Sequence, residues 1–229
     1  MPAKPAAAPR LNTKRAEMCR TAAALFRDRG FDATSVSDIA RALGMTKAGL
    51  YHYFRSKEEL LLEIMMFGLD RVRDEVIVPS RAIADPEERL RQIVLRHARI
   101  ATRAQGAVAS LTDETRALPT PARKKVEELQ RQYFDLLRET LVDIEAAGRL
   151  RKVDRTVAAF SVIGMILWLP RWFRHGGRLT TEQAATEIAN LALAGLLRPQ
   201  GQDRAARSKG SAKAKRVKST NRPTGRRTA

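Results

Sequence analysis

The sequence predicts an all-α fold of nine helices in two domains, and three observations support this prediction. Apolar residues recur at helical spacing along most of the chain, and no segment shows the period-two alternation of a strand. Helix-start signals recur at Ser35, Ser56 and Thr180, each followed three residues later by an acidic or amide side chain. Glycines such as Gly30 and Gly44 stand where helices are expected to end.

Each expected helix has its own start and stop signals. Gly44 ends the second helix because the position after a helix favours positive φ, which glycine adopts freely. Asp85 starts a later helix, with a proline and two glutamates in its first turn. The nine expected helices are 13–29, a short helix from Ser35 to Gly44, a second short helix starting near Thr46, a long helix from Ser56 that finishes before Pro79, 85–101, about 107–118, 120–148, 154–174 with a kink at Pro170, and 180–197.

The most informative segment comprises residues 34–60, with two short helices separated by a glycine turn. Leu50 and Phe54 lie four residues apart, on one face of the second helix. This arrangement is a helix-turn-helix, whose second helix enters the major groove of DNA. Its remaining residues mix hydroxyls, a cation and aromatic rings, which suit phosphates and base edges: Thr46, Lys47, Ala48, Tyr51, His52 and Tyr53. The segment therefore predicts DNA binding, and two helices that merely pack together are the alternative.

Three motifs of this segment carry a resemblance to a known family. They are Ser/Thr-Val-x-x-Ile-Ala, Gly-Met-Thr-Lys-x-x-Leu-Tyr-x-Tyr-Phe and Ser-Lys-Glu-Glu-Leu. Together they resemble the N-terminal domain of TetR-family transcriptional repressors, from Asn12 to about Phe67. The resemblance implies that Thr34, Ser35 and Lys57 contact DNA phosphates. It also implies that the exposed residues of the second helix lie along the groove.

Composition and the resemblance together predict four segments, and the resemblance implies a homodimer. The segments are a flexible arm (1–11), a helix-turn-helix DNA-binding domain (12–56), a ligand-binding and dimerisation domain (57–198) and a disordered basic tail (199–229). The last two helices are apolar nearly all round, so they must be covered on more than one side. Helix-turn-helix proteins read two half-sites, which favours a symmetric dimer. The resemblance implies that these helices form its four-helix bundle.

The net charge of +18 lies mainly at the two ends of the chain. Residues 198–229 contribute +10 and residues 1–15 contribute +4, which leaves +4 for the other 182 residues. The tail has almost no apolar residues, so we expect it to be disordered and to add sequence-independent affinity for DNA by counterion release. A solubilising extension without function is the alternative. A non-specific DNA-coating protein is the alternative function, although such a protein does not need a large apolar C-terminal domain.

Catalysis, metal binding and membrane insertion are not predicted. His52, His97 and His175 are scattered, and no phosphate-binding loop or nucleophile elbow occurs. We therefore expect no catalytic residue, no metal site and no cofactor. Cys19 is the single cysteine, which excludes an internal disulfide, and its helical apolar surroundings indicate packing. The longest uncharged run, 156–170, is shorter than the ~20 residues of a membrane helix, so we expect a cytoplasmic, nucleoid-associated protein.

By resemblance, the C-terminal domain holds a small-molecule pocket whose occupation weakens operator binding. The candidate lining residues, each of which also fits an ordinary core position, are Phe67, His97, Phe134, Met165, Trp168 and Trp172. The two tryptophans beside Arg171 and Arg174 suit an effector with an apolar body and an anionic head. The C-terminal sequence also resembles repressors that respond to acyl-CoA thioesters of fatty-acid or steroid breakdown. A drug-like or aromatic effector is the alternative, and activation of transcription is the alternative to repression.

Overall fold

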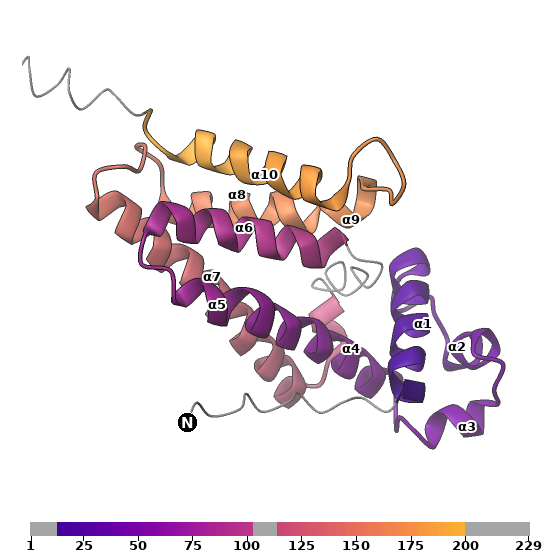
Figure 1. Cartoon of the computed structure of the whole chain (residues 1–229). Coiled ribbons are helices and arrows are strands. Elements are labelled where there is room, and N and C mark those ends of the chain that lie inside the picture. The colour runs from indigo at the N-terminus through magenta and orange to yellow at the C-terminus, as the bar shows by residue number, and fades with distance from the viewer. Residues whose placement is uncertain (1–12, 103–113, 200–229) are drawn as a thin grey trace, which may run out of the picture.

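The computed structural model describes residues 13–102 and 114–199, and in these ranges the protein is built from helices (Figure 1). The one β-type contact there is an isolated bridge between Leu150 and Leu197. The predicted all-α fold is confirmed. The elements are α1 (Thr13–Arg29), α2 (Val36–Ala42), α3 (Lys47–Tyr51), α4 (Lys57–Val72), the π-helix η1 (Arg73–Ile77), α5 (Val78–Arg81), α6 (Pro86–Thr102), α7 (Thr120–Ala146), α8 (Arg155–Leu167), α9 (Leu169–Trp172) and α10 (Thr181–Leu196).

Eight of the nine expected helices are represented among the described residues, and two of them are divided. The expected helix at about 107–118 falls mostly outside the described ranges. The long helix from Ser56 was expected to finish before Pro79. The helix α4 does end at Val72, but η1 and α5 continue helically to Arg81. Pro79 is the second residue of α5 and directly follows the π-helical turn, in which the Val78 N–H donates to the Arg73 carbonyl five residues before it.

A second proline divides the helix that was expected to run from 154 to 174. The side chain of Asp154 accepts a hydrogen bond from the Val157 N–H, which starts α8 as predicted. The helix ends at Leu167, and Pro170 lies in the first turn of the separate short helix α9. The proline therefore marks a break at Trp168, two residues upstream, and the helical segment ends before Arg174.

Two hydrophobic clusters hold the fold together. The larger one joins α6, α7, α8 and α10 around fully buried side chains such as Leu90, Leu137 and Ile166. The smaller one joins α1, α2 and α3 to the first half of α4, with Phe26 and Leu61 enclosed. Each such side chain contributes roughly 1.5–3 kcal/mol by its removal from water.

The helix α4 connects the two clusters. Its first half, including Leu60 and Ile64, belongs to the smaller cluster, while Val72 at its end packs against the larger one. Val126 of α7 also belongs to the smaller cluster. Figure 1 shows α1, α2 and α3 gathered at one end of α4, and the long helices α6, α7, α8 and α10 extending from there. The helices α4 and α7 therefore contribute side chains to both hydrophobic clusters.

No helix in the described part of the chain combines the length and apolar character needed to cross a lipid bilayer.

Candidate DNA-binding surface and ligand cavity

The helix-turn-helix is fixed by capping at the start of α2. Ser35 and Asp38 form the predicted capping box, in which each side chain accepts a hydrogen bond from the other residue's backbone N–H. The hydrogen bond from the Ser35 hydroxyl lowers the pKa of the Asp38 carboxyl below its ordinary value. Just after the end of α2, Gly44 has φ +63°, the left-handed conformation that the sequence predicted there. The turn is thus specified by local contacts.

Thr46 caps α3, since its hydroxyl oxygen accepts a hydrogen bond from the Gly49 N–H at 3.0 Å. Leu50 and Phe54 are buried beneath the helix. The opposite face is open: Thr46, Lys47, Ala48, Tyr51 and His52 are exposed. The ring of Tyr51 is 43% exposed, and the Lys47 ammonium lies 5.9 Å from its centroid.

An ionic clamp that the sequence did not indicate holds the end of this segment. Arg15 of α1 pairs with Glu63 of α4, and its guanidinium also donates a 2.9 Å hydrogen bond to the Tyr53 carbonyl oxygen. The hydrogen bond with Glu63 raises the pKa of Arg15. The guanidinium also lies 4.6 Å from the centroid of the Phe54 ring. Tyr53, predicted to lie along the groove, is half-buried and packs against the smaller cluster. The partners are 48 residues apart, so no periodic signal links them.

Thr34 and Lys57, which the family resemblance assigns to phosphate contact, hold the loop before α2. Thr34 is fully buried, and its hydroxyl donates a 2.8 Å hydrogen bond to the Gly30 carbonyl. The Lys57 ammonium donates to the carbonyls of Phe31 and Thr34, and it lies 4.0 Å from the centroid of the Phe31 ring. An ammonium has three N–H groups, so these two bonds leave one for a phosphate. Ser35 is exposed at the same edge.

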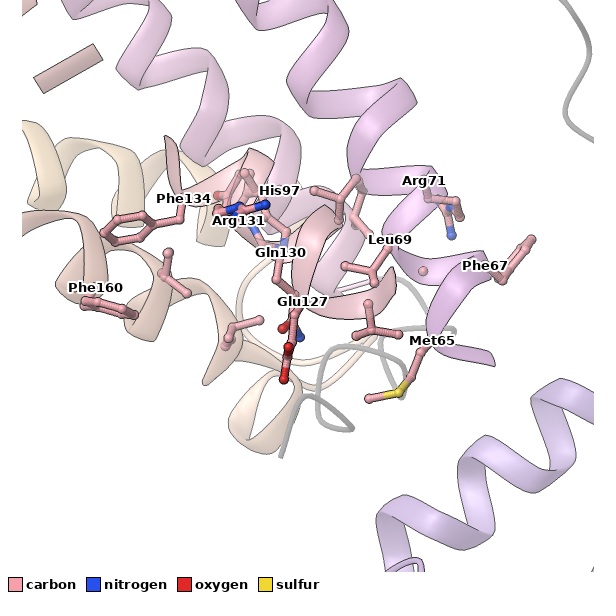
Figure 2. A pocket seen from close by; sticks show the side chains of 17 residues that line it. Met65, Phe67, Leu69, Arg71, His97, Glu127, Gln130, Arg131, Phe134 and Phe160 are labelled. Carbon is pink, nitrogen blue, oxygen red and sulfur yellow. Dashed lines mark hydrogen bonds between the residues drawn. The ribbon is translucent and has the colours of Figure 1, made fainter. Parts of the chain in front are cut away.

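A cavity of about 490 Å³ lies between α4, α6, α7 and α8 (Figure 2). Its volume falls in the range of roughly 300–1,000 Å³ that is typical of small-molecule sites. Its lining is mainly apolar and comprises Met65, Phe67, Gly68, Leu69, Arg71, Val72, His97, Ile100, Val126, Glu127, Gln130, Arg131, Tyr133, Phe134, Phe160, Ile163 and Leu167.

The polar lining residues fall into two groups. His97 and Tyr133 are buried, and the His97 Nδ1 lies 2.7 Å from the Tyr133 hydroxyl oxygen. Burial lowers the pKa of His97 to about 4 and raises the pKa of Tyr133, so both are neutral at pH 7. The polar residues nearer solvent include two that are ion-paired: Arg71 with Glu75 and Arg131 with Glu128.

The cavity contains some of the predicted lining residues and not others. Phe67, His97 and Phe134 line it. Met165 packs half-buried against the larger cluster instead. Trp168 and Trp172 are 58% and 46% exposed on α8–α9, and neither lines the cavity. Trp168 lies at the break between α8 and α9, and Trp172 is the last residue of α9.

Several lining residues were missed by sequence reasoning. Phe160 of α8 lines the cavity, and its ring centroid lies 4.9 Å from that of Phe134 (Figure 2). Tyr133 of α7 also lines the cavity and was not among the predicted lining residues, whereas its partner His97 was. A buried phenol and a buried imidazole each need a hydrogen-bond partner, and this requirement was the available signal for pairing them.

The remaining sequence predictions concern Cys19, metal binding and the tail. Cys19 is buried in the smaller cluster, as expected for a packing residue, and burial raises its pKa to about 12. Within 13–102 and 114–199, no group of three or more His, Cys, Asp or Glu side chains is arranged to hold a metal ion. The basic tail lies outside the described residues from 200 onward, as does the N-terminal arm.

Comparisons with known proteins match both parts of the chain. The model for bacterial regulatory proteins of the tetR family matches residues 19–64, and that for the tetracyclin repressor-like C-terminal domain matches residues 84–196. The HTH-type transcriptional repressor KstR2 of Mycobacterium tuberculosis is 31% identical over 192 residues, which cover 81% of this chain and 94% of that protein. KstR2 of Rhodococcus jostii is 30% identical over 188 residues, covering 81% and 92%.

Solved structures agree with the sequence comparisons. The structure of AibR in complex with isovaleryl coenzyme A and operator DNA is 37% identical, covers 78% of this chain and 97% of AibR, and has a TM-score of 0.69. The ketosteroid transcriptional regulator KstR2 of Mycobacterium tuberculosis is 29% identical, covers 84% and 99%, and has a TM-score of 0.71.

Proposed function

Because the chain belongs to the TetR family of bacterial transcriptional regulators, which are not enzymes, we propose that it is a ligand-responsive repressor. It binds a palindromic operator as a homodimer and releases it when an apolar effector fills the cavity. One observation supports the coupling between effector binding and operator release. Met65 and Val126 line the cavity and are also buried in the hydrophobic cluster of the helix-turn-helix domain.

The proposed DNA contact uses the exposed face of α3. Lys47, Tyr51 and His52 offer an ammonium, a phenol and an imidazole on one short helix. Such groups reach base edges and phosphates in a major groove. Ser35 and the remaining N–H of Lys57 contact phosphates beside the groove, while the buried Thr34 supports the loop from inside.

The proposed dimer uses an apolar surface on α8, α9 and α10. Its side chains are 46–65% exposed: Val157, Phe160, Trp168, Trp172 and Leu191. Large apolar side chains gathered on adjacent helices mark an interaction surface. When two copies of the chain meet about a two-fold axis through this surface, each covers the apolar side chains of the other. The dimer then presents two recognition helices to two half-sites.

The proposed effector is apolar, and an acyl-CoA thioester is the first candidate. The cavity volume suits an acyl group, and Arg71 and Arg131 line its more exposed part, where an anionic nucleotide would lie. AibR was solved with isovaleryl coenzyme A, which supports this class. The relation to KstR2, a ketosteroid regulator, supports a steroid-derived effector as the second candidate.

Release requires that the effector prefer the conformation that does not bind DNA. A tenfold loss of operator affinity needs only about 1.4 kcal/mol of such preference. Filling the cavity against Met65 and Val126 displaces side chains that are fully packed on the other side, and close-packed interiors transmit such displacements.

The test begins with selection of an operator from random duplexes by the full chain. We expect a palindromic site bound by a dimer, and isovaleryl-CoA or a longer acyl-CoA to raise the dissociation constant at least about tenfold. The same compound is expected to raise the melting temperature of the free protein. Selection of no preferred sequence would contradict the proposal, and free CoA serves as the control for the nucleotide alone.

Deleting residues 199–229 is expected to weaken operator binding without changing sequence preference. The tail carries half of the net positive charge, and each cation paired with a phosphate adds about 0.9 to the slope of log affinity against log salt. The measurement is this slope for the full and the shortened chain. An unchanged slope would show that the tail does not contact DNA. Complete loss of binding by the shortened chain would favour the non-specific coating protein instead.

A further inference from the structure

The pair His97–Tyr133 is the buried one of the two polar groups that line the mainly apolar cavity. His97 is 5% exposed and Tyr133 is 6% exposed, whereas Glu127 and Arg131 of the same lining are exposed to solvent. The rings meet edge to face, with centroids 4.9 Å apart. An apolar site that contains one buried polar pair holds its ligand by shape and orients it by hydrogen bonding.

The free atom of this pair is the His97 Nε2. Its Nδ1 is bonded to the Tyr133 hydroxyl, and no described residue provides a partner for Nε2. The fully enclosed side-chain polar atoms without a partner, among the described residues, are the Ser80 Oγ and the Arg96 Nε. The Nε2 is therefore not sealed by protein atoms, and the open space that His97 lines is the cavity.

The number of satisfied donors and acceptors indicates that the His97 Nε2 carries the imidazole proton. The imidazole is neutral at pH 7, because burial lowers its pKa to about 4, and it carries one N–H group. If Nδ1 carried the proton, it would donate to the phenol, and the phenol O–H would lack an acceptor among the described residues. If Nε2 carries the proton, the phenol O–H donates to Nδ1, and the Nε2–H is the one group of the pair that lacks a partner. The second arrangement leaves fewer buried groups unsatisfied and is favoured.

We infer that His97, oriented by Tyr133, determines effector specificity by donating a hydrogen bond from Nε2 to a carbonyl oxygen of the ligand. The inference rests on the proposed effector role of the cavity. Both candidate classes share this chemistry, since a thioester and a ketosteroid each combine an apolar body with a carbonyl. A purely apolar ligand of the same shape leaves the donor unpaired and is disfavoured.

The test compares ligands that differ only in the carbonyl group. The probes are isovaleryl-CoA with S-isopentyl-CoA, in which a methylene replaces the carbonyl, and benzophenone with diphenylmethane for ligands without CoA. We expect the wild-type protein to bind the carbonyl member of the tighter pair at least about tenfold more strongly, as measured by titration calorimetry.

Three variants locate the effect. His97→Phe is expected to bind both members of a pair about equally. Tyr133→Phe keeps the aromatic ring and is expected to fold. It is expected to reduce the preference for the carbonyl ligand, because Nδ1 no longer accepts a hydrogen bond from the phenol O–H. The control is Phe134→Leu, which changes an apolar lining residue and should weaken both members equally, leaving their ratio intact.

The outcomes separate the inference from the proposed function. Equal affinity of the wild-type protein for both members of a pair overturns the inference while the ligand cavity stands. A preference that survives Tyr133→Phe and His97→Phe unchanged also overturns it. Binding of none of the four probes contradicts the proposed effector site, and with it the inference. A carbonyl preference that is seen only with the CoA pair identifies a thioester as the class of effector. A preference that is seen only with benzophenone and diphenylmethane identifies a ketone.

Discussion

The Tyr51→Ala variant is expected to bind the selected operator at least about 100-fold more weakly than the wild-type protein. Tyr51 is the most exposed aromatic ring of α3, and its neighbours Leu50 and Phe54 are buried, so its removal leaves the helix packing intact. A groove contact contributes about 1–3 kcal/mol, and a dimer makes the contact at both half-sites. The measurement is fluorescence anisotropy of the labelled operator at fixed salt.

A matched control separates this effect from general disturbance. Val78→Ala removes a comparably exposed apolar side chain from α5, away from α3, and should leave operator binding unchanged. Circular dichroism and the melting temperature verify that Tyr51→Ala is folded. Wild-type affinity of the folded Tyr51→Ala variant would mean that the recognition surface has been assigned to the wrong face.

The sequence predicted the helix-turn-helix well because local contacts specify it. Capping by Ser35 and Ser56 was read from the spacing of a few residues, and the structure contains both. The glycine of the turn was equally local, since positive φ is a property of one residue. Signals of this kind do not depend on which distant segment packs against the motif.

The prolines show where local signals were insufficient. Pro79 and Pro170 were read as the limit and the kink of single helices, yet each lies in the first turn of a new short helix. Both interpretations use the same rule, because a proline disrupts a helix interior but fits a first turn. Tertiary contacts are close to both prolines: Ile77, two residues before Pro79, and Leu169, directly before Pro170, are buried in the larger cluster.

The ligand cavity was the least predictable feature. Its lining comes from four helices, and only the packing of α4 against α6, α7 and α8 decides which face of each lines it. The aromatic pair Trp168 and Trp172 looked like a ligand site in sequence because aromatics and cations stand together. In the structure they are exposed beside the equally exposed Phe160, and Arg171 lies 4.6 Å from the Trp168 ring centroid. The same composition fits a subunit interface, in which aromatic residues and arginine are enriched.

Substituting Leu191 with arginine is expected to convert the protein to a monomer and to abolish operator binding. Leu191 is 65% exposed on α10, and in the proposed dimer it is covered by the partner subunit. A guanidinium in that position would be buried without a counter-ion, which disfavours association by several kcal/mol. Because the side chain is exposed in the single chain, the fold itself should be unaffected.

Loss of dimerisation removes DNA binding through geometry alone. When two recognition helices are joined, binding of the first half-site holds the second at a high effective concentration, and a monomer forfeits this gain. Sedimentation velocity measures the oligomeric state and anisotropy the affinity. Val78→Arg, at a site 60% exposed on α5, introduces the same charge outside the proposed interface and should leave both unchanged. If the Leu191→Arg variant is dimeric and binds the operator with wild-type affinity, the dimer interface does not include Leu191 of α10.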